Sequence, residues 1–529
     1  MDTRRRLARV RPRLASAVAR RFGIDWRALV AFRVALGLLL LVDLLLRSRS
    51  LVAFYTDRGV LPRSALAELA PMHHALSIHT LSGAAWAQAL LFLVAGVVAV
   101  ALVVGYRTRL ATVLSLVLLL SLQFRNPYVQ NSGDALLRWL LLWSVFLPLG
   151  ERVSVDALRR GVRSATESAA GSRREWRPRD RVVSPASAGL LLQVVLVYAS
   201  NALLKSRGTL WTNGEAIYYV LSLRRFTVLL SDLFAGSPWV FGPLGHLWFA
   251  MLVASPLLVL LTGRGRALLA GLFVVMHAGM TATLMIGLFP LISIVALLPF
   301  FPAVVWDAVE TRVAGALLGR VAVGRLGGRL RRALLRFDPR PASRVVPRSV
   351  AEAVGRWRRV VGPPAVACLL ALVLVWNAAA VGLVTLPAAV TDVEDPEEYQ
   401  WSMFAPNPLG VDGWYVVPGE LASGGRVDAF HGGSVRWDRP PDVSDTYPTA
   451  RWGKYLGSVR WDENRLAGPF AEYVCRRWNA DHETELTSVR IVHVDQPTRL
   501  SGQEPTRRVE LARRSCDVGP AVRKTGRER

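Results

Sequence analysis

Lysine is almost absent from this chain. Of its 65 basic residues only Lys205, Lys454 and Lys524 are lysines, so Lys205 is the only lysine among the first 450 residues. A position that needed only a positive charge would therefore carry arginine here. A lysine ammonium loses its proton when burial removes its hydration, whereas a guanidinium stays protonated. The lysine at position 205 therefore predicts either a proton-accepting amine or an interfacial lysine that reaches water from a helix end.

Cysteine and the motifs of soluble enzymes are also scarce. The chain has three cysteines and no CxxC pair, P-loop or HExxH motif, and HETEL at 482–486 lacks the second histidine of such a zinc site. We therefore predict no metal. Cys368 lies in an apolar run, where we expect it to pack against neighbouring helices. Cys475 and Cys516 could form a disulfide in an oxidising compartment or remain free thiols, and the pattern leaves both open.

Long apolar runs, in contrast, are abundant. Hydrophobic residues make up 52% of the chain, and several runs reach the roughly 18 residues that a bilayer core requires. Other runs are shorter or contain proline, which a helix packed inside a bundle tolerates. The sequence predicts a mainly α protein, a polytopic membrane bundle of about nine transmembrane helices over 26–46, 84–104, 110–124, 134–149, 184–204, 244–261, 267–285, 287–305 and 364–384.

Arginine is distributed unevenly among the loops between these runs. With the N-terminus in the cytoplasm, the inner segments carry 35 arginines and the outer loops carry nine basic residues. Short cytoplasmic loops hold such an excess, so we expect a multi-pass plasma-membrane protein with a cytoplasmic N-terminus and a C-terminal region outside. A nucleic-acid-binding protein would instead gather its arginines on one folded face. We therefore expect the lipid bilayer, and no nucleic acid, as a partner.

The region after the last apolar run has a different composition. It holds six tryptophans, an alternating run at 488–494 and turn dipeptides that are typical of strands. In PFAEYVCRRWN, Phe470, Val474 and Trp478 share one helical face. These features predict a small extracytoplasmic α+β domain, mostly β. The expected organisation is a basic N-terminal segment 1–25, a transmembrane bundle 26–306, a cytoplasmic loop 307–362, a last transmembrane helix 363–386, an outer domain 387–517 and a disordered tail 518–529.

Charged and polar residues within the apolar runs are costly in a bilayer unless they are paired or functional. Arg33 and Asp43 are ten residues apart, about 15 Å along a helix, so each is expected to pair with another helix. Asp134 and Arg138 are four residues apart and predict an ion pair on one helical face. His277 is either a hydrogen-bonded core group or part of a cavity wall, because a Gly-Leu-Phe-Pro helix break follows it.

Five segments together resemble a known membrane family. They are FYTDRGVLP, GYRTR, RNPYVQNSGD, YASNALLKSRGTLWTNGEA and MHAGMTATLMIGLFP, which occur in this order between residues 54 and 290. In sequence and order they resemble the horizontally transferred transmembrane (HTTM) domain, the membrane domain shared with vitamin K-dependent gamma-carboxylases. The resemblance covers roughly residues 20–306.

The resemblance implies chemistry on a membrane quinol. In that family a reduced vitamin K quinol is deprotonated and reacts with oxygen, and the strong base that forms removes a proton before carbon dioxide adds. Lys205, within a Y…K…W…G pattern, matches the lysine that acts as the base toward the quinol. His277 matches a histidine of the pocket wall, and Asn131, Asn201 and Trp211 are the other candidates for contact with a quinone-like cofactor.

The chain also departs from that family. A second functional histidine of the carboxylases has no counterpart in QNSGDALL at 130–137, and a tail of about 140 residues stands in place of their large propeptide-binding domain. Two functions therefore stay open. One is a quinol-dependent enzyme that uses oxygen or carbon dioxide as co-substrate. The other is a non-catalytic membrane scaffold that displays its C-terminal domain to a protein partner outside the cell.

Overall fold

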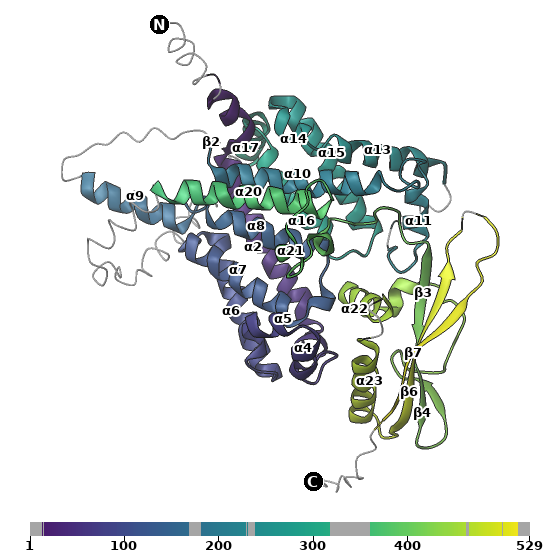
Figure 1. Cartoon of the computed structure of the whole chain (residues 1–529). Helices are drawn as coiled ribbons and strands as arrows, with labels where there is room; N and C mark the ends of the chain where they lie inside the picture. Colours follow the sequence, from purple (N-terminus) through teal and green to yellow (C-terminus); the bar gives the residue numbers. More distant parts are fainter. Residues whose placement is uncertain are drawn as a thin grey trace.

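Helices dominate the computed structural model, which describes residue 13 and residues 15–168, 181–228, 230, 238–317, 360–461, 465–499 and 501–516. The expected cytoplasmic loop 307–362 lies mostly outside the described residues, as do most of the N-terminal segment and the tail after residue 516. Figure 1 shows the long helices gathered in one bundle and the strands of the C-terminal region on one side of it. The main helices are α2 (Trp26–Ser48), α6 (Ala85–Val104), α7 (Thr108–Arg125), α8 (Ser132–Val145), α10 (Pro185–Lys205), α13 (Phe241–Val253), α15 (Gly263–Thr283), α16 (Phe289–Leu297), α17 (Ala303–Leu317) and α20 (Gly362–Ala380).

Shorter helices and turns connect these elements or belong to the C-terminal region. The helices are α3 (Leu51–Tyr55), α4 (Arg63–Leu69), α5 (Pro71–Leu76), α9 (Val155–Ser168), α11 (Ala216–Ser222), α14 (Leu257–Leu260), α21 (Ala388–Thr391), α22 (Ala450–Trp461) and α23 (Ala467–Asp481). The 3-10 turns are η1 (Ile78–Thr80), η2 (Pro127–Val129), η3 (Pro238–Val240), η4 (Leu298–Phe300), η6 (Pro396–Tyr399) and η7 (Val443–Thr446). A two-residue ladder joins β1 (Ile24–Asp25) to β2 (Arg181–Val182).

Six helices are long and apolar enough to cross a membrane: α2, α6, α7, α10, α15 and α20. The number rises to seven if the segments 289–300 and 303–312, which meet at a bend of 104°, form one broken span. The expected nine spans are therefore not confirmed within the described residues. Helices α8 and α13, with 14 and 13 residues, are shorter than the roughly 20 residues that a perpendicular span needs.

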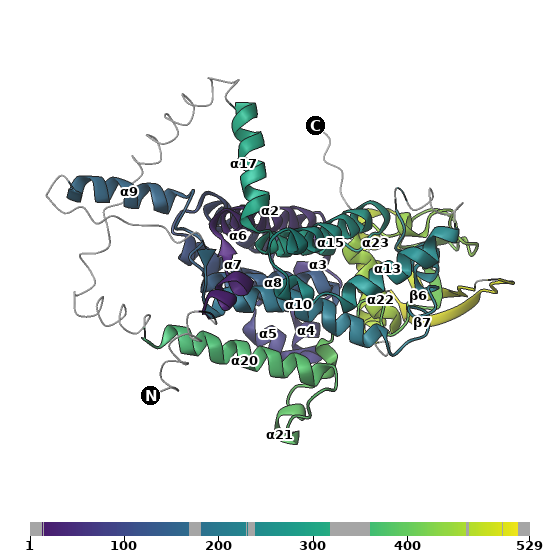
Figure 2. The ribbon, with the colours of Figure 1, turned by 90° about the horizontal axis from the view of Figure 1, so that it is seen from above.

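The centre of the bundle is α10, the most buried of the six long helices. It begins with a capping box in which Ser184 and Ser187 satisfy each other's backbone N–H groups, and Pro185 occupies the first helical position. Helix α10 contacts α8, α13 and α20. Helix α20 runs along one side of the bundle in Figure 2, and Cys368 on it is exposed, so the prediction that Cys368 packs against neighbouring helices is wrong. An exposed apolar surface on α20 suits contact with lipid rather than with protein.

The C-terminal region forms a five-stranded antiparallel sheet. Strands β3 (Val411–Val416) and β4 (Pro418–Leu421) pair with β6 (Leu486–Pro497), β5 (Arg426–Asp428) pairs with β4, and β7 (Arg507–Ser515) pairs with β6. The alternating run at 488–494 thus lies in β6, and the predicted helix is α23, where Phe470 and Val474 are buried. A disulfide joins Cys475 on α23 to Cys516 after β7, which decides between the two alternatives that the sequence left open.

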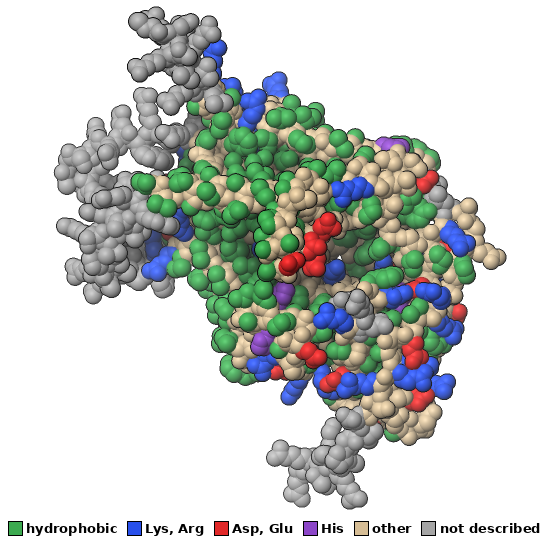
Figure 3. All heavy atoms as spheres, in the orientation of Figure 1, with side chains coloured by type: hydrophobic (Ala, Val, Ile, Leu, Met, Phe, Trp, Pro, Cys, Tyr) green, Lys and Arg blue, Asp and Glu red, His purple; other side chains and the backbone are tan. Residues whose placement is uncertain are grey.

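One of the two hydrophobic clusters spans the bundle and the C-terminal region. The Phe54 ring, from α3, lies 4.7 Å from the Trp452 ring and 5.9 Å from the Tyr455 ring of α22, measured between centroids. All three side chains are buried. Figure 3 shows hydrophobic side chains covering the face over α7 and α20, whereas charged side chains gather over the sheet. This division is expected if lipid surrounds the bundle and water surrounds the sheet.

The sheet contains a buried group whose ionisation makes the C-terminal region sensitive to acid. Burial lowers the pKa of His493, on β6, to about 4, even though its Nδ1 lies 2.7 Å from Asp495 Oδ1. An unfolded histidine titrates near pH 6.5, so the unfolded chain binds the extra proton between pH 6.5 and 4 and the folded chain does not. The free energy of unfolding should therefore fall by about 3 kcal/mol across that interval. Burial raises the pKa of Asp412, so the folded chain binds this proton more tightly than the unfolded chain does. At the acid end of the interval this uptake partly offsets the loss of stability from His493.

Denaturant unfolding of the sheet at pH 7 and at pH 5, followed by tryptophan fluorescence, measures this dependence. Glutamine at position 493 cannot titrate, so the free energy of unfolding of His493→Gln should differ less between pH 7 and pH 5 than that of the wild type. An unchanged pH dependence in His493→Gln would contradict the assignment, whatever the absolute stability of that variant. Arg460 donates to Asp495 over 2.8 Å and keeps that carboxylate paired in both proteins.

Candidate functional site

Lys205 is the last residue of α10 and its side chain is only 1% exposed. Its Nζ donates to the carbonyl oxygen of Met403 over 2.6 Å and to that of Phe404 over 3.2 Å. The same ammonium lies 3.8 Å from the centre of the Trp211 ring, a cation–π contact. Lys205 therefore does not reach water from the helix end, which excludes the interfacial alternative in this structure.

Two other predicted site residues converge on the same segment as Lys205. Asn201, one helical turn earlier on α10, donates through Nδ2 to the carbonyl oxygens of Trp401 over 2.7 Å and Met403 over 3.1 Å. Trp211 Nε1 donates to the carbonyl oxygen of Phe404 over 2.7 Å. Three side chains thus hold the backbone of 401–404, the segment that leads from α20 to the sheet. We call these three residues and the carbonyls they bind the linker clamp.

The clamp also receives support from the last long helix. Trp401 Nε1 donates to Asn377 Oδ1, on α20, over 3.1 Å, and both residues are buried. The segment 401–404 is therefore fixed between α10 and α20. An ammonium that is already hydrogen-bonded to two carbonyls offers no lone pair, so Lys205 can accept a proton only after it has lost its own proton and these contacts have changed.

His277 lies apart from the linker clamp, in the middle of α15. Its Nδ1 lies 2.8 Å from the carbonyl oxygen of Phe273, and its ring centre is 5.8 Å from that of Tyr198 and 6.0 Å from that of Phe289. Its Nε2 is buried and has no hydrogen-bond partner among the described residues. The hydrogen bond of Nδ1 fits the core alternative for His277, and a place for this residue in a cavity wall stays a prediction.

Asn131 caps α8 and touches the helix break that follows α15. Its Oδ1 accepts from Gly133 N over 2.8 Å, and its Nδ2 lies 3.5 Å from the carbonyl oxygen of Ile286. At this break Gly287 has a φ of +67°, which favours glycine. Asn131 and His277 thus both lie beside the segment 286–289, while Lys205, Asn201 and Trp211 hold 401–404.

Tyr198 connects the two groups of predicted residues. It precedes Lys205 by two turns of α10, about 10 Å along the helix, and its ring contacts that of His277. Two pockets of about 290 and 470 Å³ lie elsewhere in the bundle, and neither is lined by Lys205 or His277.

A buried cluster of charges, which the sequence did not reveal, joins the bundle to the C-terminal region. Arg47 Nε donates to Asp43 Oδ2 over 2.7 Å, and its other nitrogens donate to Asp134 and to the Tyr55 hydroxyl. Arg451, from α22, donates to Asp43 Oδ1 over 2.6 Å and to both oxygens of Asp134 over 3.0 and 3.1 Å. We call these five residues the charge cluster; its two carboxylates and two guanidinium groups balance.

The charge cluster corrects one sequence-based expectation and extends another. The predicted Asp134–Arg138 pair is wrong: Asp134 binds two other arginines, and Arg138 donates to Gln123 Oε1 over 3.3 Å. Arg33 does find partners outside its own helix, since it donates to backbone carbonyls of the loop 149–153. The spacing of Asp43 and Arg47 was a sequence signal for an ion pair, but nothing in the sequence pointed to Arg451.

Fold and site together define a multi-helix protein with helices of membrane-spanning length and a small C-terminal sheet fixed to the bundle. Comparisons of the chain with protein-family models, with curated proteins and with solved structures gave no match. Within the described residues no group of three or more His, Cys, Asp or Glu side chains could hold a metal ion.

Proposed function

We propose that the chain is a multi-pass plasma-membrane scaffold whose helical bundle holds the C-terminal region in one fixed position outside the cell, as a surface for a protein partner. The observation that carries this proposal is the charge cluster, in which α22 inserts Arg451 between Asp43 of α2 and Asp134 of α8. Asp43 and Asp134 are 3% exposed and Arg451 is 14% exposed.

Burial of these charges makes the docking specific. Transferring ions out of water costs several kcal/mol each, and the cost is recovered only when the partners meet in good geometry. A C-terminal region that moved away would leave Asp43 and Asp134 to share Arg47 alone. The charge cluster therefore acts together with the linker clamp and the Phe54 contacts to favour one relative position of bundle and sheet.

The orientation rests on the distribution of charge and on the disulfide. The arginine excess of alternate loops favours a cytoplasmic N-terminus. The Cys475–Cys516 disulfide favours an oxidising compartment for the sheet. Both arguments support an extracytoplasmic C-terminal region.

Labelling of single cysteines in intact cells with a membrane-impermeant maleimide tests this orientation. In a Cys368→Ser background, a cysteine at Ser423, in the exposed turn between β4 and β5, should react. A cysteine at position 343, which lies outside the described residues, should react only after the cells are lysed. Labelling at 343 but not at 423 in intact cells would show that the orientation is opposite to the one proposed.

The second candidate function is quinol chemistry of the kind that the HTTM resemblance implies, with Lys205 as the base. One observation favours it: the buried Nε2 of His277 has no partner in the described part of the chain and could accept a hydrogen bond from a quinol hydroxyl. Asn131 borders the same helix break, since its Nδ2 lies 3.5 Å from the carbonyl oxygen of Ile286. Mass spectrometry of lipids extracted with the purified protein separates the candidates, because a quinone retained in stoichiometric amount supports the enzyme and its absence supports the scaffold.

A further inference from the structure

A small polar pocket lies where the segment before α2 meets the start of α15. Its volume is about 20 Å³, which is room for one particle of the size of a water molecule. Figure 1 shows β2 and α17 near the same end of the bundle as the N-terminus. The lining residues, among them three arginines and one aspartate, are Arg20, Gly23, Asp25, Arg181, Thr262, Gly263, Arg266, Pro299, Phe300, Phe301 and Pro302.

Arg266, on the first turn of α15, is the buried cation of this pocket, with a side chain that is 4% exposed. Its Nη1 donates to Arg21 O over 3.0 Å, but its Nε and Nη2 are buried and have no hydrogen-bond partner among the described residues. The Phe300 ring lies 5.0 Å from Cζ and covers one face of the guanidinium. Nε and Nη2 form one edge of that plane, so their two N–H groups can bind a single acceptor together.

The aspartate of the pocket is already bound to another arginine. Asp25 Oδ1 accepts from Arg27 N over 2.9 Å and from Arg27 Nε over 3.0 Å, and its Oδ2 accepts from Arg27 Nη2 over 3.0 Å. Asp307 and Glu310, from α17, accept from Arg27 Nη1 over 2.7 and 2.9 Å. The carboxylates at this end of the bundle are thus gathered on Arg27, and the Nε/Nη2 edge of Arg266 has none of them.

Two further groups around the pocket favour an anion. The side chain of Thr262 makes no capping hydrogen bond at the start of α15, where the first N–H groups of the helix have a positive partial charge. A Cβ at Gly263 would have nothing within 4 Å, so the backbone there is open to a ligand. Arg181, on β2, is near enough to repel Arg266. A negative ion between these groups would relieve the repulsion.

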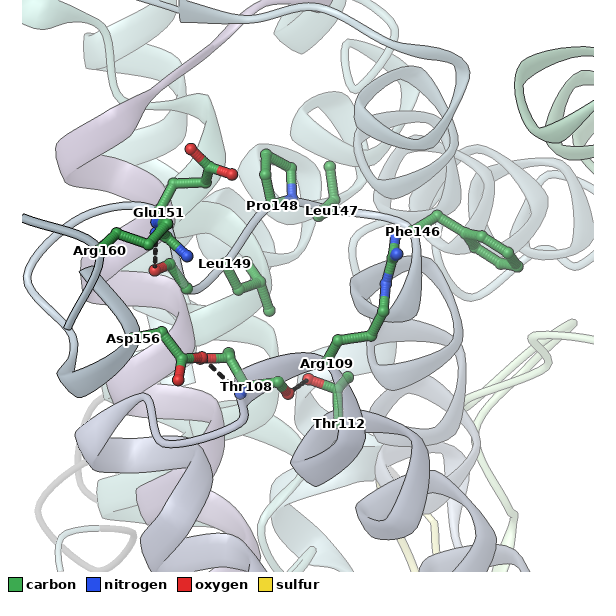
Figure 4. Close-up of a pocket in the computed structure, with 11 residues that line it drawn as sticks. Thr108, Arg109, Thr112, Phe146, Leu147, Pro148, Leu149, Glu151, Asp156 and Arg160 are labelled. Carbon is green, nitrogen blue, oxygen red and sulfur yellow. Dashed lines mark hydrogen bonds between the residues drawn. The ribbon is translucent and has the colours of Figure 1, made fainter. Parts of the chain in front are cut away.

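The larger polar pocket at the start of α7 lacks this excess of positive charge. Its two arginines, Arg109 and Arg160, are matched by Glu151 and Asp156. Figure 4 shows the Asp156 carboxylate bonded to the start of α7, where its Oδ2 accepts from Thr108 N over 2.8 Å. The start of α7 therefore already binds an anionic group of the chain itself, whereas no side chain caps the start of α15.

We propose that the pocket at the start of α15 binds one small monovalent anion, and chloride has the size and charge that fit. The Nε/Nη2 edge of Arg266 donates to the ion, and the start of α15 and the guanidinium groups of Arg20 and Arg181 surround it with positive charge. The volume of the pocket favours an ion of one atom over a tetrahedral phosphate. The bound ion joins β2, α15 and the segment before α2, and the site is independent of what the C-terminal region binds.

Broadening of the chloride NMR signal by the full-length protein in detergent tests the proposal. Gluconate, an anion too large for the pocket, keeps the ionic strength constant during the titration. The wild type should broaden the signal saturably. Arg266→Gln should bind chloride at least about tenfold more weakly, because hydrogen bonds from a charged group are lost. The matched control is Arg264→Gln, which removes an exposed arginine from the same turn of α15 and should bind like the wild type.

A second variant keeps the test valid if Arg266→Gln folds poorly. Arg181→Gln retains the buried guanidinium of Arg266 and removes a neighbouring charge, so it should also weaken chloride binding. Chloride should raise the midpoint of thermal unfolding of the wild type by mass action, and by less in each of these two variants. Chloride binding equal to that of the wild type in the folded variants would overturn the proposal. Displacement of chloride by inorganic phosphate at equal concentration would overturn the assignment of a one-atom ion.

Discussion

Replacing Arg451 by glutamine is expected to lower the stability of the docked C-terminal region by about 3–5 kcal/mol, because it leaves an uncompensated charge buried in the cluster. Asp43 and Asp134 would then compete for Arg47. Limited proteolysis in nanodiscs should cut the segment around 390–410 much faster than in the wild type. The matched control is Arg426→Gln, since Arg426 lies in the same sheet with a 70% exposed side chain and a distant partner at 3.8 Å.

A double-mutant cycle separates the charge effect from general damage. Asp134→Asn combined with Arg451→Gln removes one charge of each sign, so the pair should cost less than the sum of the single variants. Strict additivity would show that Arg451 and Asp134 do not act on each other. If Arg451→Gln is cut by the protease at the same rate as the wild type, the charge cluster does not hold the C-terminal region.

The loss of stability on substituting Lys205 should depend on how well the new side chain packs in the linker clamp. Lys205→Ala is expected to cost about 3 kcal/mol, because it removes the hydrogen bonds to Met403 and Phe404 and leaves a cavity beside Trp211. Lys205→Arg should cost about 1–3 kcal/mol through overpacking at this 1% exposed position. Lys205→Met has a similar volume, and Asn201 and Trp211 still donate to both carbonyls, so it should cost less than about 1.5 kcal/mol.

Thermal unfolding of the three variants in nanodiscs measures this order, with Lys454→Met as the control because Lys454 is exposed. A loss in Lys205→Met as large as that in Lys205→Ala would contradict the packing account. Lys205→Met also tests the quinol candidate, since it preserves the fold and removes the amine. The scaffold account predicts no quinol consumption in any of these proteins, whereas consumption by the wild type that Lys205→Met abolishes would favour the enzyme.

The sequence predicted the elements that depend on local pattern. Hydrophobic length placed the six helices of membrane-spanning length, and alternation and helical periodicity placed β6 and α23. The count of nine spans is not confirmed where a helix is short or bent, as in α8 and around Pro299–Pro302, because local hydropathy does not show which helices are covered by their neighbours. The resemblance predicted Lys205, Asn201 and Trp211 as site residues, and their side chains do lie together in the structure.

What the sequence did not show are contacts between distant segments. Arg451 is 317 residues from Asp134 in sequence, and no local pattern distinguishes it from the other arginines of the C-terminal region. No sequence pattern marks the carbonyls of 401–404 as binding groups, since every residue has a backbone carbonyl. Lys205 was predicted as a base or as an interfacial cation because both roles are side-chain properties. Its role in the structure is defined by the backbone that it binds.

The distance between two spin labels shows directly whether the bundle and the C-terminal region keep one relative position. Cysteines at Arg49, after the end of α2, and at Ser423, between β4 and β5, would carry the labels in a Cys368→Ser protein in nanodiscs. A single narrow distance distribution is expected in this protein, and a broad one when Arg451→Gln is added. A broad distribution without the Arg451 substitution would show that the C-terminal region is not fixed to the bundle.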